Sequence, residues 1–215
     1  MIWIMLELRV ESVETPLLAA GAAASLALAL VARAQVMGFL PTAAIVLDRD
    51  LLVELAEELR KSGIGTLASG SLARAARSEP VDPAALADAL RATIEAVDSS
   101  PHPQGEWKTA RELLDDDVLA RLLKVSNLSL RRYAGSERRT PDEVAWRLHL
   151  VARLLAALAG SYNEYGVRRW FERPRSALGG ATPAQVLEHA DSEDDEAVQR
   201  LVALADDLMG AGAAA

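Results

Sequence analysis

Side chains that can read DNA cluster between Ser126 and Arg139, in the segment SNLSLRRYAGSERR. An asparagine amide pairs with adenine and an arginine guanidinium with guanine in the major groove, whereas hydroxyls and a helix N-terminus suit phosphate oxygens. The sequence predicts a helix capped by Ser126, with polar residues facing outward between Leu128, Leu130 and Tyr133. The predicted DNA-binding residues are Ser126, Asn127, Ser129, Arg131 and Arg132, with Arg138 and Arg139 of the following loop placed for phosphate contact.

An apolar pattern just upstream predicts the element that positions these residues. Leu119, Ala120 and Leu123 share the inner face of a helix, and the small Ala120 allows a second helix to cross closely. The stretch Asp116 to Tyr133 therefore has a helix-turn-helix pattern. Lys124 departs from it, because glycine is usual at that place in the turn, and it predicts a strained or diverged turn. A solvated basic face that binds nothing is the alternative explanation of the arginines.

The charge distribution agrees with a DNA-binding segment in the middle of the chain. The net charge of the 215 residues is -8, but residues 107–175 hold 14 Lys+Arg against 9 Asp+Glu. Residues 1–106 hold 8 against 14, and residues 176–215 hold 1 against 8. A basic middle between acidic ends is typical of a nucleic-acid-binding module with protein-binding flanks. Chance segregation of the charges is the alternative.

Composition limits the other kinds of chemistry. The chain has no cysteine, which excludes disulfides and thiolate metal sites and agrees with a reducing cytoplasm. His102, His149 and His189 are far apart in sequence, without the spacing of metal ligands. We find no nucleophile with a base, no recognisable carboxylate pair and no phosphate loop. The sequence therefore predicts neither an enzyme nor a bound cofactor or metal.

A second motif occupies Gly166 to Leu187, GVRRWFERPRSALGGATPAQVL. Val167, Trp170 and Phe171 fall at i, i+3 and i+4 and share one face of a helix. Pro174 then ends this helix, because its ring removes a backbone donor and restricts the residue before it. A helix end, a turn and a new helix start are thus predicted within one short stretch.

The turn and the new helix have their own signals. The pair Gly179-Gly180 permits backbone angles that a side chain would penalise, and Thr182-Pro183 supplies an N-cap followed by proline at the first helical position. With these features the motif resembles the signature of the toxin-binding domain of the Xre/MbcA/ParS family of antitoxins. The residues that match the family pattern are Gly166, Arg169-Trp170, Pro174, Leu178-Gly179-Gly180 and Thr182-Pro183.

The resemblance implies an antitoxin whose partner is usually a RES-domain toxin that consumes NAD. The helix-turn-helix pattern is similar to the Xre-type regulators that precede this domain in the family, and the C-terminal part of related antitoxins covers the substrate pocket of the toxin. Trp170 is expected mainly to pack in the core. The toxin-binding residues that the resemblance implies are Arg169, Trp170, Pro174, Leu178, Gly179, Gly180, Thr182 and Pro183.

Two long helices are predicted around these motifs. Thr140-Pro141-Asp142-Glu143 reads as a capping box with proline at the first helical position, and it opens a helix of about 20 residues that ends near Gly160. Its apolar circumference suits either core packing or a dimer contact. After a short helix from Pro183 to His189, acidic residues 191–196 precede the last helix, and the tail GAGAAA is predicted to be disordered.

The first hundred residues show no motif with chemistry. Met1 to Val13 alternates in part, as a short strand would, and helices are predicted at 48–61, from Ser71 and after Asp82. The uncharged run TPLLAAGAAASLALALVA reads as a buried helix or as a translated stretch upstream of a start at Met37. A membrane span is the less favoured explanation, because the run is short and rich in alanine. Residues 99–105 read as a linker.

We therefore expect an all-α protein with a helical N-terminal region (1–100), an Xre-like helix-turn-helix (107–160) and a small helical toxin-binding domain (161–210). The expected function is an antitoxin that neutralises its cognate toxin in the cytoplasm and represses its own operon, as a homodimer on operator DNA. Three alternatives remain: a DNA-binding transcriptional regulator without a toxin, an adaptor tethered to the membrane by residues 16–32, and an enzyme whose site is assembled from residues scattered along the chain.

Overall fold

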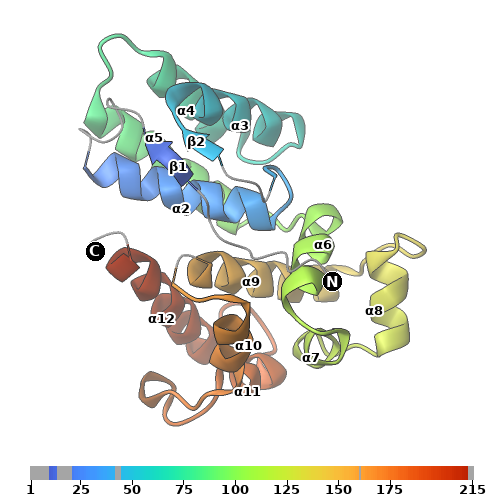
Figure 1. Cartoon of the computed structure of the whole chain (residues 1–215). Coiled ribbons are helices and arrows are strands. Elements are labelled where there is room, and N and C mark those ends of the chain that lie inside the picture. Colours follow the sequence, from blue (N-terminus) through green and yellow to red (C-terminus); the bar gives the residue numbers. More distant parts are fainter. Residues whose placement is uncertain (1–9, 14–20, 42–44, 160, 213–215) are drawn as a thin grey trace. The chain divides into compact units, whose positions relative to one another are not determined.

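The computed structural model describes residues 10–13, 21–41, 45–159 and 161–212 of the chain (Figure 1). The chain forms two compact units: the N-terminal unit consists of residues 8–35 and 39–100, and the C-terminal unit consists mainly of residues 101–215, with residues 36–38 added to it. Most of the described residues are helical, and a small two-stranded sheet accompanies them. The prediction of an all-α protein is thus confirmed in its main point, and the short strand near the N-terminus is found at Val10–Val13, residues 1–9 lying outside the described part.

The N-terminal unit begins with a parallel strand pair. Strand β1 (Val10–Val13) pairs with β2 (Ile45–Leu47), and helix α2 (Ala22–Val36) lies between them in sequence, because parallel strands need a long crossover connection. The described part of the apolar run belongs to α2, whose Ala27, Leu30 and Val31 are buried as the sequence predicts. Within the described residues, no helix is long and apolar enough to cross a membrane.

Three further helices complete this unit: α3 (Arg49–Lys61), α4 (Thr66–Arg77) and α5 (Pro83–Asp98). The side chain of Asp48 caps α3 and that of Asp82 caps α5, which confirms two predicted helix starts. The prediction for α4 was wrong by five residues, since this helix begins at Thr66 rather than Ser71. A Cβ on Gly65 would lie only 2.4 Å from the Cβ of Ala96 on α5, so the glycine lets α4 start against its neighbour.

The C-terminal unit is entirely helical in the described residues. Its elements are α6 (Pro103–Leu113), α7 (Asp116–Leu122), α8 (Asn127–Ala134), α9 (Asp142–Leu158), α10 (Glu164–Glu172), the 3-10 turn η1 (Ser176–Leu178), α11 (Pro183–His189) and α12 (Glu196–Gly212). Helix α6 was missed at the sequence level, and its start at Pro103 shortens the predicted linker 99–105 to its first four residues. Helix α12 runs to Gly212, into the tail that was predicted to be disordered; residues 213–215 lie outside the described part.

Helix α9 forms the spine of this unit, packing against α6 and α12 (Figure 1). Its apolar circumference is explained by core packing, because side chains such as Leu148, Val151 and Leu155 are fully buried. The predicted capping box at its start is wrong. Pro141 is the N-cap residue and no side chain caps this helix, since the hydroxyl of Thr140 instead accepts a hydrogen bond from Trp107 Nε1 at 2.9 Å.

Candidate functional site

The connection between α7 and α8 has the geometry of a tight turn closed by backbone bonds. Val125 N donates to Ala120 O at 3.0 Å, and the buried Leu119, Ala120 and Leu123 form the inner face predicted for α7. Lys124 adopts φ +54, in the left-handed region where a side chain costs about 1–2 kcal/mol relative to glycine. The predicted strain at Lys124 is therefore present, and the turn keeps the backbone that glycine would give.

The side chain of Lys124 provides a compensating contact. Its Nζ donates to Ala190 O at 2.9 Å, at the end of α11, and lies 3.6 Å from the Asp191 carboxylate. Glycine in this place would relieve the backbone strain but lose both contacts. The lysine thus ties the turn before α8 to the C-terminal end of α11.

Helix α8 presents its basic residues to solvent, as predicted. Ser126 Oγ accepts from Ser129 N at 3.1 Å and caps the helix, while Leu130 and Tyr133 are buried. Arg131, Arg132, Arg138 and Arg139 are all exposed. The prediction that Leu128 belongs to the inner residues is wrong, because this leucine is 61% exposed and shares the outer face with Arg131 and Arg132 at i+3 and i+4.

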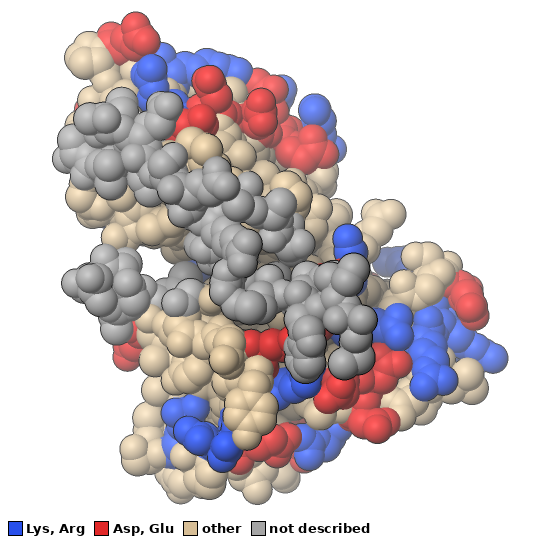
Figure 2. Space-filling view, in the orientation of Figure 1, with Lys and Arg blue, Asp and Glu red and all other residues tan. Residues whose placement is uncertain are grey.

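Carboxylates accompany the basic face. Asn127 Nδ2 donates to Asp117 Oδ1 at 2.6 Å, and Arg131 Nε lies 3.5 Å from Asp116 Oδ2. The hydrogen bond from Arg111 is the main cause that lowers the pKa of Asp116, and Arg131 adds to it. Figure 2 accordingly shows Lys and Arg side chains gathered over α8 with acidic side chains beside them. These contacts engage Nδ2 of Asn127 and Nε of Arg131.

The bend between α10 and α11 is open to solvent. Gly179 (φ +66) and Gly180 (φ +88) are exposed, and a Cβ built on either would meet no atom within 4 Å. Their glycine requirement is therefore conformational and not steric. Gly180 N donates to Arg175 O at 2.9 Å and Arg175 N to Ala181 O at 3.0 Å, which closes the loop. Thr182 and Gln185 form a full capping box at the start of α11.

The residues that the antitoxin resemblance implies divide into two groups. Trp170 and Pro183 are buried, so they hold the motif in place and are not available for direct contact. Trp170, at 1% exposure, stacks edge-on against Phe171 and lies under the guanidinium of Arg175. The accessible members of the set are Arg169, Pro174, Gly179 and Gly180, with Leu178 and Thr182 half-buried. Arg169 donates to the hydroxyl of Tyr165, which is itself 64% exposed.

A groove of about 460 Å³ lies beside this bend. Apolar side chains line much of it, among them Leu178, Val186 and Val198, while Asp195 and Glu196 border it at the start of α12. These acids belong to the acidic C-terminal segment that the sequence reveals. The exposed bend and the groove together form one accessible surface with an apolar floor and a negative rim.

The two candidate surfaces belong to one packed unit and are linked by buried or bridging cations. Arg147 on α9 donates to Leu187 O at 3.0 Å and to Ala190 O, so Ala190 O accepts from both Arg147 and Lys124. Burial lowers the pKa of Arg147. Arg121 on α7 bridges Glu172 on α10 and Glu188 on α11.

Sequence reasoning missed a buried polar pair in the core of the same unit. Glu106 on α6 and His149 on α9 are 0% and 1% exposed, and Glu106 Oε1 lies 2.6 Å from His149 Nδ1. The same oxygen accepts a hydrogen bond from His102 N at 3.1 Å. The two residues are 43 positions apart in the sequence, and no sequence motif connects them. Only the packing of α6 against α9 reveals the pair.

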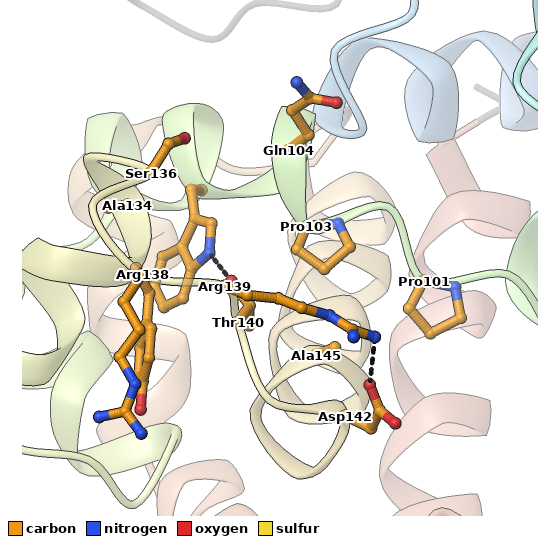
Figure 3. Close-up of a pocket in the computed structure, with 12 residues that line it drawn as sticks. Pro101, Pro103, Gln104, Ala134, Ser136, Arg138, Arg139, Thr140, Asp142 and Ala145 are labelled. Atoms are coloured by element: carbon orange, nitrogen blue, oxygen red, sulfur yellow. Dashed lines mark hydrogen bonds and ion pairs between the residues drawn. The ribbon is translucent and has the colours of Figure 1, made fainter.

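A pocket of about 720 Å³ lies beside the C-terminal end of α8 (Figure 3). Trp107 and Tyr133 stack in its wall, 6.3 Å between ring centres. The loop 135–140 and the starts of α6 and α9 supply the other sides. This pocket was not predicted, because α6 was not recognised in the sequence.

No group of His, Cys, Asp and Glu in the described residues could hold a metal ion. Comparison of the chain with models of known protein families, with curated proteins and with solved structures gives no match.

Proposed function

We propose that the chain is the antitoxin of a toxin–antitoxin pair, binding its toxin through the bend surface and its own operator DNA through α8. The proposed partner is a RES-type toxin that consumes NAD, and the proposed site of action is the cytoplasm. The observation that carries the proposal is the open glycine bend, whose left-handed glycines and free surroundings leave a shaped surface uncovered.

The surroundings of the bend suit a protein partner. Arg169 and Tyr165 form an exposed arginine–tyrosine pair, a combination enriched among residues that dominate binding energy at interfaces. The groove beside the bend has an apolar floor and an acidic rim, which complements a basic cleft such as one that binds a dinucleotide phosphate. Buried Trp170 keeps α10 in place behind this surface.

The toxin prediction concerns Arg169. In a co-purification of the full chain with the tagged product of the adjacent gene, Arg169→Glu is expected to weaken the complex at least about tenfold, since an exposed interface arginine is replaced by the opposite charge. The matched control is Arg91→Glu, an exposed arginine on α5 that the proposal does not use. Equal retention of toxin by both variants would contradict this surface. In cells that express the toxin, Arg169→Glu should also relieve growth inhibition less than Arg91→Glu does.

The second half of the proposal is DNA binding by α8. The turn at Lys124, the Ser126 cap and the outer face of Leu128, Arg131 and Arg132 support it. Arginine reads guanine or contacts phosphate, and an exposed leucine on the same face can contact a thymine methyl group. A homodimer would place two such helices on paired half-sites.

The DNA prediction concerns Arg131 and Arg132. Replacing both by alanine is expected to weaken binding to a sequence selected from a random duplex library by about 10- to 100-fold, and to flatten the salt dependence, because phosphate contacts are lost. Asp116→Asn is expected to act in the opposite direction, since it frees Arg131 and removes a negative charge beside the DNA. Unchanged binding by the double variant in a gel-shift titration would exclude α8 as the reader.

A transcriptional regulator without a toxin is the second candidate. It is favoured because the α7–α8 turn is closed by its own backbone hydrogen bonds. The proposed DNA binding by α8 therefore does not require a partner at the bend. The two candidates separate on the neighbouring gene: a RES-like reading frame supports the antitoxin, and its absence supports a regulator that uses the bend surface for self-association.

A further inference from the structure

The pocket beside α8 has the size and walls of a small-molecule site. Its volume of about 720 Å³ lies in the range of ligand pockets, roughly 300–1,000 Å³. Its walls come from α6, the end of α8, the loop after α8 and the start of α9, all within the C-terminal unit. None of the residues proposed for toxin binding lines it.

Two arginines of the loop border the pocket. Arg138 lies over the ring of Tyr133, with its guanidinium carbon 5.7 Å from the ring centre. Arg139 extends along the pocket toward Asp142, as Figure 3 shows, and its Nη2 lies 3.5 Å from Asp142 Oδ1. Both members of this pair are exposed, and such pairs contribute only about 0–1 kcal/mol. Asp142 also begins α9, where the helix N-terminus favours a negative charge. Arg139 can therefore leave Asp142 at little cost.

The rest of the pocket combines rigid apolar walls with a held loop. Pro101, Pro103 and Ala145 supply apolar parts of its lining. Ser136 adopts φ +58, a left-handed conformation unfavourable for a residue with a side chain, and such backbone strain concentrates at ligand-binding sites. The hydrogen bond from Trp107 Nε1 to Thr140 Oγ1 fixes the other end of the loop and leaves the hydroxyl proton of Thr140 free to donate.

We propose that this pocket binds a small organic anion, with an apolar body against the proline and alanine walls and a carboxylate, sulfonate or phosphate group on Arg139, while Arg138, whose guanidinium points away from that of Arg139 in Figure 3, borders the other end of the pocket. Bidentate pairing with a guanidinium suits such a head group. This site does not depend on toxin binding or DNA binding. Should α8 bind DNA, occupation of the pocket would withdraw Arg139 from the phosphate backbone.

The experiment is a fluorescence titration of the full chain with 8-anilinonaphthalene-1-sulfonate, an anion with an apolar body, and with its neutral counterpart N-phenyl-1-naphthylamine. The folded chain is expected to bind one sulfonate probe saturably. Arg138→Gln with Arg139→Gln should weaken it at least about fivefold, since charge-assisted hydrogen bonds are lost, and should leave the neutral probe unaffected. Ala145→Phe, which fills the pocket from a half-buried position, should weaken both probes.

Arg173→Gln is the matched control, an exposed arginine outside the pocket. Circular dichroism at each titration temperature establishes that every variant is folded. Absence of saturable binding by the folded wild-type chain would overturn the proposal. An equal loss in the control, or no loss in the double arginine variant, would also overturn it.

Discussion

Replacing Trp170 by alanine is expected to destabilise the C-terminal unit by about 3–5 kcal/mol, the range for removing a large aromatic side chain from a core. Trp170 is 1% exposed, and its ring meets that of Phe171 edge-on at 5.3 Å between centres. Its removal leaves a cavity at the base of the bend. Urea denaturation followed by far-ultraviolet circular dichroism measures the loss.

Trp170→Phe separates packing from hydrogen bonding. Trp170 Nε1 has no hydrogen-bond partner within the described residues, so phenylalanine sacrifices volume but no polar contact. This variant should lose less than half as much stability as the alanine variant. The exposed Arg169→Ala should change stability by less than about 0.5 kcal/mol, as surface substitutions usually do. An alanine variant at Trp170 with wild-type stability would refute the packing role assigned to this side chain.

Glu106→Ala is expected to cost a similar amount, about 3–5 kcal/mol, because it leaves the buried His149 without its carboxylate partner. The cost has a second source, since Glu106 Oε1 also accepts from His102 N at the start of α6. The chemical denaturation curve at neutral pH measures the difference from the wild-type chain.

The double substitution Glu106→Leu with His149→Leu tests whether the cost comes from the loss of the contact between Glu106 and His149. Replacing both members of a buried polar pair by apolar residues of similar volume is often neutral or stabilising. The double variant should therefore be more stable than Glu106→Ala. If the stability changes of the single substitutions Glu106→Leu and His149→Leu sum to that of the double variant, the two side chains do not act as a pair.

Local signals in the sequence were sufficient to predict most helix ends. Asp82 and Thr182 cap their helices as predicted, and α11 has the predicted bounds from Pro183 to His189. These capping signals involve only residues within one helical turn, so the helix ends that they mark can be predicted from the sequence alone. Thr140 shows the limit of such reasoning, because its hydroxyl is taken by the indole of Trp107, 33 residues earlier in the chain.

The candidate sites were predictable only where they follow a continuous motif. The open bend at Gly179-Gly180 requires left-handed glycines, a demand that the residue types themselves express. The exposure of Leu128 was not predictable, because an apolar residue between Asn127 and Ser129 looks like a core position until the helix is placed on its neighbours. The Glu106–His149 pair and the pocket beside α8 depend on packing between helices that are distant in the sequence. No local sequence pattern predicts either of them.

The carbonyl of Ala190 receives hydrogen bonds from cations on two different segments, Lys124 in the turn before α8 and Arg147 in the middle of α9. If the proposed toxin displaces the end of α11, it will alter the contacts of Lys124, which lies in the turn before α8, the proposed DNA-binding helix. If both proposed partners bind, thermodynamic linkage makes the effect mutual: the factor by which the toxin changes the affinity for operator DNA equals the factor by which operator DNA changes the affinity for the toxin. Measuring three of the four equilibria in that cycle determines the fourth.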